Sequence, residues 1–382
     1  MLSNGMRNRP ITRPSGGEDE WLAVREPLVS GWLTQGAKVA EFEAAFAARH
    51  GVKHAIATTS CTTALHLALV ALDIRPGDEV IVPAFTWVAT ANVVRYCGAT
   101  PVFSDVDPVT FNIDPEKIAA AITPRTKAIV PVHLFGLCAD MDTIAEVAGE
   151  IPLVEDAACA AGAAYRGRPA GSLGRIGCFS FHPRKIITTG EGGMVTTNDD
   201  QLAERINMLR NHGASLSEEQ RHHGAKPYLL PDFNMLGFNY RMTDLQGAVG
   251  IVQLTKLDEF VAERRRLAAE YTRQLANIAW LHAPIVNEAY QHSWQTYVCR
   301  IDEGTAPLSC QDIMQQLQEW GIGVRPGTHA IPDLGLYDTH KHANEYPHAT
   351  YCSRQTIALP LFNGMTTDDI DYVARTLETI SK

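Results

Sequence analysis

The stretch "DEVIVPAFTWVATANVVRYCGATPVFSDV" (residues 78–106) decides the fold class. Residues 78–83 (DEVIVP) contain an apolar run of valine and isoleucine after two acidic residues, which predicts a buried strand. A helix is expected over 86–97 and a second strand over 100–106. Strand, helix and strand in this order form a βαβ unit, in which the two strands run parallel.

The same alternation continues on both sides of this unit. Further strands are expected at 54–60, 126–133, 151–156, 178–181 and 192–199, and helices at 62–72, 114–122 and 140–148. Strands that alternate with helices predict an α/β fold with a mostly parallel sheet flanked by helices. Functional residues are then expected at the carboxyl ends of the strands.

The pattern changes near residue 250. A long helix is expected over 243–277, followed by a strand at 295–301 and helices at 311–321 and 367–380. We therefore expect a flexible N-terminal arm (1–20), a large α/β domain (21–250) and a small α+β domain (251–382). The segment 212–232 lacks periodicity and is too long for a simple connection, which is typical of a functional loop.

Composition narrows the class of protein. The chain has 382 residues, of which 45% are hydrophobic, and a net charge of −10. An acidic total argues against a general nucleic-acid or membrane binder, because both need a basic face. No apolar run reaches 18 residues, and the N-terminus lacks the apolar core of a signal peptide. The eight cysteines form no CxxC pair, so we expect reduced thiols in a cytoplasmic protein.

Several familiar motifs are absent or misplaced. No G-x-G-x-x-G stands between a strand and a helix, and the G-x-x-G-x-x-G spacing of Gly171, Gly174 and Gly177 precedes a strand instead. A metal site is conceivable at the histidines of the polar loop that holds His340, His342 and His348. Their irregular spacing favours a solvated surface instead.

The stretch "CFSFHPRKIITTGEGG" (178–193) places Lys185 just after a buried strand. A buried lysine is costly unless its charge is satisfied or its pKa is lowered. Lys185 is therefore either a surface residue or a nucleophile that forms a Schiff base with an aldehyde cofactor. Pyridoxal phosphate (PLP) is such a cofactor, and it also needs a carboxylate at its ring nitrogen, a phosphate site and a surface for stacking.

Each requirement has a candidate at a strand end. Asp156 closes one strand, and the hydroxyl-rich turn 59–66 opens a helix whose amides would face a phosphate. Trp87 offers a flat surface, and Ser180 a further hydroxyl. Singly, these residues are most simply helix caps or core residues. Their order along successive strand ends favours a PLP site with Lys185.

A resemblance supports this interpretation. The stretch "VEDAACAAGAAYRGRPAGSLGRIGCFSFHPRKIITTGEGGMVTTND" (154–199) resembles the nucleotide-sugar aminotransferases of the DegT/StrS type, a family of fold-type I PLP enzymes. The resemblance spans roughly residues 20–380 and includes "TSCTTALHLALVAL", "GDEVIVPAFTWVATANVV", "PVFSDVDPVTFNIDPEKI", "PVHLFG" and "GFNYRMTDLQGAVGIVQL". It implies a mostly parallel sheet of the seven-stranded type with a smaller C-terminal α+β domain.

The resemblance also implies roles for site residues. Lys185 would bind the cofactor covalently and carry protons, and Asp156 would hold the pyridine nitrogen. Trp87 would stack on the ring, while Thr62 and Ser180 would contact the phosphate.

Three more positions follow from the resemblance. Asn239 would reach the phosphate of a neighbouring subunit, which implies a homodimer with shared active sites. Cys61, in the phosphate turn, replaces the family's usual glycine or alanine. Cys159 replaces its usual histidine or glutamine near the cofactor's ring hydroxyl, and a thiol is a weaker hydrogen-bond donor.

The implied reaction is a ping-pong transfer of an amino group from L-glutamate to a ketosugar. The stretch 182–193 is similar to the branch of the family that aminates C4 of nucleotide-linked 4-keto-6-deoxy sugars. Arg325 and His329 are candidates for contacts to the diphosphate, because the family places their loop over the substrate. His182, beside the lysine, is a further candidate for a sugar contact.

Other functions stay open at this point. A PLP-dependent sugar dehydratase shares the fold, but it has a histidine in place of the lysine, so Lys185 speaks against it. An aminotransferase for a C3-keto or other keto sugar is a second alternative, and a non-catalytic binding protein a third. The nucleotide, the sugar and the pathway, whether lipopolysaccharide O-antigen or secondary metabolism, are not decided by these residues.

Overall fold

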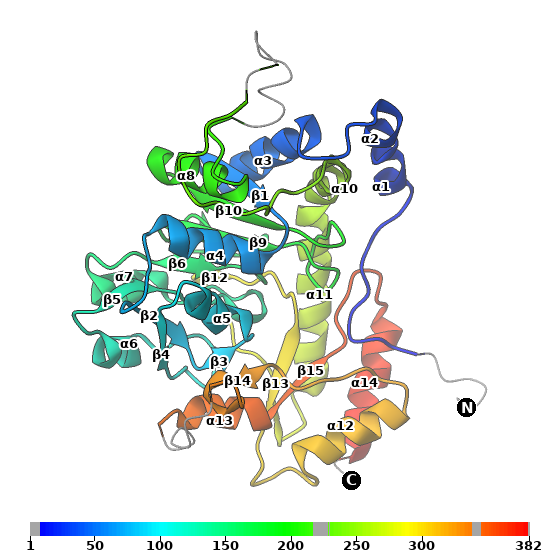
Figure 1. Ribbon diagram of the computed structural model, residues 1–382. Helices are drawn as coiled ribbons and strands as arrows, with labels where there is room; N and C mark the ends of the chain where they lie inside the picture. The colour runs from blue at the N-terminus through cyan, green and yellow to red at the C-terminus, as the bar shows by residue number, and fades with distance from the viewer. Residues whose placement is uncertain (1–7, 217–227, 229, 338–344, 381–382) are drawn as a thin grey trace.

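A seven-stranded sheet forms the centre of the computed structural model, which describes residues 8–216, 228, 230–337 and 345–380 (Figure 1). A four-stranded and a three-stranded sheet are joined by parallel bridges from Ile129 to Leu153 and from Val132 to Asp156. The spatial order is β1 (His54–Thr58), β10 (Gly193–Thr197), β9 (Ile176–Ser180), β6 (Val154–Asp156), β5 (Thr126–Ile129), β2 (Glu79–Pro83) and β4 (Thr100–Ser104). Of these strands only β10 is antiparallel to its neighbours, which confirms the expected mostly parallel sheet.

Both faces of the sheet are buried. Val80 and Val82 of β2 belong to one hydrophobic cluster, while Ile81 belongs to another, because side chains alternate along a strand. The covering helices are α3 (Ala37–His50), α4 (Cys61–Ala71), α5 (Ala89–Tyr96), α6 (Pro115–Ala121), α7 (Met141–Ala148) and α8 (Asp200–Arg210).

Two elements in this part are shorter than the sequence predicts. The strand expected at 126–133 ends at Ile129, two residues before Pro131, which has no N–H to donate to a ladder. The helix expected at 86–97 begins only at Ala89, because β3 (Phe85–Thr86) pairs with β14 (His329–Ala330).

The long helix expected at 243–277 is in fact two helices, α10 (Asp244–Thr255) and α11 (Leu257–Leu275). Lys256 separates them, and its amine lies 2.8 Å from Glu20 of α1 (Glu18–Ala23). This contact joins residues 236 positions apart, so the helical periodicity of the segment gives no sign of it.

The C-terminal part has its own hydrophobic cluster, built from residues between Leu267 and Leu377. It contains the antiparallel strands β11 (Leu281–His282), β13 (Tyr297–Ile301) and β15 (Thr356–Leu359) and the helices α12 (Cys310–Glu319) and α14 (Thr367–Ile380). The remaining elements are α2 (Arg25–Ser30), α13 (Pro347–Arg354), the strands β7 (Ala164–Tyr165), β8 (Arg168–Pro169) and β12 (Tyr290–Gln291), and the 3₁₀ turns Leu134–Gly136 and Ile331–Asp333.

The N-terminal segment lies against this C-terminal part. The Arg9 amide donates to the Gly321 carbonyl at 2.9 Å, and the Leu361 amide donates to that of Ile11 at 3.2 Å. Helix α1 begins at Glu18, inside the range expected for the arm. The division into an arm and two domains stays a prediction.

All eight cysteines are free thiols. The described part of the chain contains no helix that is long and apolar enough to span a membrane and no cluster of side chains suited to a metal. His340 and His342 lie outside the described residues. The Nδ1 atom of His348 lies 3.0 Å from the Val106 carbonyl oxygen, a contact within the fold.

We expect His50 to make the protein sensitive to acid. Its ring is 1% exposed and stacks on Phe46 at 4.0 Å, and burial lowers its pKa from 6.5 to about 4. Between these pH values the unfolded chain binds the proton more readily, so stability is full above about pH 6.5 and falls toward pH 4. The loss should reach about 3 kcal/mol.

Thermal unfolding of the wild type and His50→Phe between pH 7 and pH 4 measures this effect. The variant should lose less stability than the wild type as the pH falls, whereas His282→Gln, at an exposed strand position, should follow the wild type. Parallel pH profiles for the wild type and His50→Phe would contradict the assignment.

Candidate active site

A tight turn after β9 sets the position of Lys185. The Lys185 amide donates to the His182 carbonyl at 2.8 Å, and Pro183 occupies the second position of this turn, where its fixed φ is favoured. The Thr189 amide then donates to the Phe181 carbonyl at 3.0 Å. The chain thus reverses at the end of the strand, with Lys185 inside the reversal.

The amine of Lys185 meets a thiol. Lys185 Nζ lies 3.1 Å from Cys159 Sγ, in the loop that follows β6. Burial acts to lower the pKa of Lys185, but the neighbouring acidic groups, Cys159 first, outweigh it and hold the pKa above its usual value. Lys185 is therefore in contact with Cys159, the position at which the sequence departs from the family pattern.

Asp156 ends β6 as a buried carboxylate. The Thr90 hydroxyl donates to it at 2.8 Å and the Ala158 amide at 3.2 Å. Burial raises the pKa of Asp156, while these hydrogen bonds and the charge of Lys185 act to lower it. A cationic group beside this carboxylate would therefore be strongly favoured.

The N-terminus of α4 faces the same region. Ser60 caps the helix: its hydroxyl accepts from the Thr63 amide, and its own amide donates to the Thr63 hydroxyl at 3.0 Å. Within the described residues the Cys61 and Thr62 amides and the Thr62 hydroxyl have no partner, so they can serve an anion. A Cβ on Gly193 would lie 2.4 Å from the Ser60 carbonyl, so only glycine lets β10 pass this turn.

Cys61 has two different environments. Its amide belongs to the helix N-terminus, whereas its sulfur lies 3.9 Å from Asp156 Oδ1 and 3.5 Å from the Cys178 carbonyl. Burial raises the pKa of this thiol well above its usual value, so it is neutral at pH 7. Only the amide of Cys61 is available to a phosphate.

Pairing of β3 with β14 brings two more predicted residues, Trp87 and His329, close to each other. His329 lies opposite Thr86, and its ring centroid is 5.8 Å from that of Trp87. Trp87 is 59% exposed, so its indole presents a free face instead of filling the core. Arg325, in the same loop, is half-buried, and its Nε atom is buried without a partner.

The other predicted residues lie at the edges of this region. Ser180 is half-buried and accepts from the His182 amide at 3.4 Å. His182 is also half-buried, and its Nδ1 accepts from the Arg184 amide. The Asn239 side chain is exposed, on a segment that bridges to Asn211.

These residues fit pyridoxal phosphate. Asp156 is a buried carboxylate suited to a protonated ring nitrogen, and the open amides of α4 are suited to a phosphate. Lys185 supplies the amine for an aldehyde, and the free face of Trp87 suits a flat ring. The residues come from distant parts of the chain but converge at the carboxyl ends of β6 and β9 and on the helix after β1.

Thr90 and Arg184 belong to the site but were missed by the sequence analysis. Thr90 donates to Asp156, and Arg184 precedes the lysine. A hydroxyl one helical turn after Trp87 was a weak signal for Thr90. No pattern marked Arg184.

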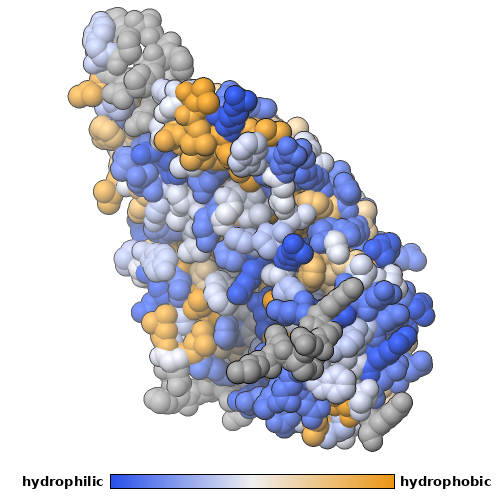
Figure 2. Space-filling view, turned by 90° about the vertical axis from the view of Figure 1, so that its right-hand side faces the viewer, coloured by the Kyte–Doolittle hydropathy of each residue, from blue (hydrophilic) through white to orange (hydrophobic). Residues whose placement is uncertain are grey.

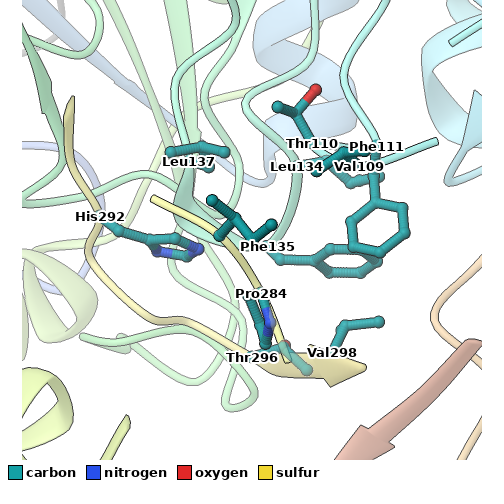
Figure 3. A pocket seen from close by; sticks show the side chains of 11 residues that line it. Val109, Thr110, Phe111, Leu134, Phe135, Leu137, Pro284, His292, Thr296 and Val298 are labelled. Carbon is teal, nitrogen blue, oxygen red and sulfur yellow. The ribbon is translucent and has the colours of Figure 1, made fainter. Parts of the chain in front are cut away.

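An apolar pocket elsewhere contains none of the predicted residues (Figure 3). The rings of Phe111 and Phe135 meet there with centroids 5.6 Å apart, and His292 lies on the opposite side of the pocket. Burial lowers the pKa of His292 to about 3, so the ring is neutral. Because it contains no charged group and none of the predicted site residues, we do not assign this pocket to the active site.

Comparison with known proteins decides the family. Residues 14–378 match the DegT/DnrJ/EryC1/StrS aminotransferase family. The chain belongs to this family. It is 45% identical to the GDP-perosamine synthase of Caulobacter vibrioides over 96% of both chains.

Solved structures agree with this membership. A putative sugar aminotransferase of Streptococcus pneumoniae in its PMP form matches with a TM-score of 0.91 and 30% identity, over 98% of this chain and 99% of that one. The same protein was solved in its PLP form. DesI with its TDP-sugar product matches with a TM-score of 0.89 and 34% identity, over 98% and 93% of the two chains. The present chain is therefore a PLP-dependent sugar aminotransferase of fold type I.

Proposed function

We propose that this aminotransferase moves the amino group of L-glutamate to the C4 keto group of a nucleotide-linked 4-keto-6-deoxy sugar. The 45% identity to a GDP-perosamine synthase supports this substrate class and makes a GDP-linked sugar the first candidate. The observation that carries the proposal is the convergence of Lys185, Asp156 and the N-terminus of α4 on one site.

The residues have distinct tasks in this proposal. The bound cofactor supplies an electron sink for the carbon that carries the amino group. Lys185 Nζ takes the α-proton of the donor and later returns a proton to the sugar carbon. Asp156 keeps a positive charge on the ring nitrogen, with Thr90 fixing the orientation of the carboxylate.

Other residues would bind the cofactor and the sugar nucleotide. Trp87 would stack on the cofactor ring, and Thr62 with Ser180 would contact its phosphate. Arg325, His329 and His182 would contact the sugar nucleotide.

We further propose a homodimer in the cytoplasm, with Asn239 of each chain reaching the other chain's phosphate site. Apolar side chains gather at the end of the molecule where α1 and α2 lie (Figure 2). Among them Trp21 is 67% and Val29 78% exposed, and Leu236, near Asn239, is 89% exposed. A second copy would bury such surfaces. Light scattering that returns the mass of a single chain would contradict this assembly.

A panel of sugar nucleotides tests the function. The protein is first converted with L-glutamate, which should release one 2-oxoglutarate per site, and is then mixed with 4-keto or 3-keto sugars linked to GDP, dTDP or UDP. We expect the GDP-linked 4-keto-6-deoxy sugar to restore the original absorption spectrum and to yield a 4-amino sugar. Faster reaction of a 3-keto sugar would contradict C4 specificity, and a deoxygenated product without an amine would indicate a dehydratase.

A further inference from the structure

Two arginines share one cleft beside the catalytic lysine. Arg184 precedes Lys185 in the chain, and Arg325 enters from the loop before β14. Both line a cleft whose other walls are Ile11, Thr12, Gln295, Thr296, Leu359 and Leu361. None of these lining residues is acidic.

Neither guanidinium is neutralised within the fold. In the described part of the chain, neither Arg184 nor Arg325 forms an ion pair, and the buried Nε of Arg325 has no hydrogen-bond partner. Burial lowers the pKa of Arg325, and the nearby charge of Arg184 acts in the same direction. The partly buried Arg325 cation is costly without a counter-charge, and the exposed Arg184 adds to the same cleft a second cation without an ion pair among the described residues. The cleft is therefore suited to an anion with two charges.

The position of the cleft indicates which anion fits. Arg325 lies near Cys159, whose sulfur touches Lys185 Nζ. An amino acid that reacts at this lysine carries its α-carboxylate one bond from the reacting carbon. Arg184 is exposed, so it lies at the outer side of the cleft, where a second carboxylate would extend.

We propose that Arg325 and Arg184 bind the α-carboxylate and the side-chain carboxylate of a dicarboxylic amino donor. This inference rests on the proposed use of L-glutamate as donor and deepens it. Arg184 is then the residue that makes the enzyme select an acidic donor over a neutral one. Guanidinium groups suit this task, because each can hold a carboxylate through two parallel hydrogen bonds.

Binding of glutarate to the holoenzyme tests the proposal without turnover, since glutarate has two carboxylates and no amine. Calorimetry should show that Arg184→Gln weakens glutarate about tenfold or more and leaves the monocarboxylate butyrate unchanged. Arg325→Gln should weaken both ligands. Arg273→Gln, an exposed arginine paired with Glu270 on α11, serves as the control and should change neither affinity.

Two results would overturn the inference. One is an Arg184→Gln variant that binds glutarate as well as the wild type. The other is a variant that keeps glutarate affinity but loses affinity for GDP, which would assign the cleft to the diphosphate. Both leave the proposed function intact as long as the wild type transaminates with L-glutamate. A wild type that binds glutarate but releases no 2-oxoglutarate from L-glutamate would count against the proposed function alone.

Discussion

Replacement of Lys185 by alanine is expected to lower turnover by roughly a thousandfold or more, the range seen when a nucleophile that is also the acid–base group is removed. The reason is local. The Lys185 amine is held 3.1 Å from Cys159 by a turn that pins it beside Asp156, and alanine removes the amine without disturbing that turn. The variant should therefore fold normally and still bind the cofactor non-covalently.

Three measurements separate these effects. Steady-state assays give the loss of turnover, and thermal unfolding should match the wild type. Mass spectrometry after borohydride reduction should find the cofactor on the peptide with Lys185 in the wild type and on no peptide in Lys185→Ala. Lys117→Ala, at an exposed position of α6, should behave as wild type in all three. If the cofactor were found on another lysine in Lys185→Ala and turnover were preserved, the assignment of Lys185 as the cofactor-binding lysine would be wrong.

The main residues of the candidate site could be predicted from the sequence, because parallel strands end at one edge of the sheet. Asp156 ends β6 and Lys185 follows β9, and these strands are neighbours. Their positions at strand ends therefore favoured a shared site, which the family resemblance then supported. The mostly parallel sheet was predictable because strands and helices alternate along the chain, whereas its seven-stranded type followed from the family resemblance.

Contacts between distant segments were not predictable in this way. The pairing of Thr86 with His329 joins residues 243 positions apart, and the loop of His329 entered only through the family resemblance. Lys256, where the helix divides, pairs with the distant Glu20, and the cleft of Arg184 and Arg325 depends on how two loops meet. Local pattern carries no information on such contacts, because tertiary packing decides them.

The contact of Cys159 with Lys185 shows the same limit. Its sequence position marked a departure from the family, and only the structure pairs its sulfur with the amine. A thiol holds a lysine less firmly than a carboxylate or an amide oxygen would.

Glu155 explains the glycine spacing that had no role in the sequence. This carboxylate is fully buried and accepts four hydrogen bonds, from the His133 ring at 2.8 Å and from the amides of Gly171, Leu173 and Gly174. A Cβ at Gly174 would lie 2.8 Å from the Leu153 carbonyl, so the loop can wrap the carboxylate this closely only with glycine there. The G-x-x-G-x-x-G stretch thus forms a loop whose backbone amides bind the Glu155 carboxylate, and we call this loop the Glu155 cradle.

Replacement of Glu155 by leucine is expected to destabilise the protein by about 3–5 kcal/mol, because it leaves His133 and three backbone amides buried without partners. Glu155→Gln should cost less, since its amide oxygen keeps some of the acceptor capacity. Denaturant unfolding measures both, with Glu146→Gln, exposed on α7, as the control. Because Glu155 adjoins Asp156 on β6, the leucine variant should also bind the cofactor more weakly. If Glu155→Leu were as stable as the wild type, the loop amides would have found other acceptors. That result would contradict a stabilising role of the Glu155 cradle for β6.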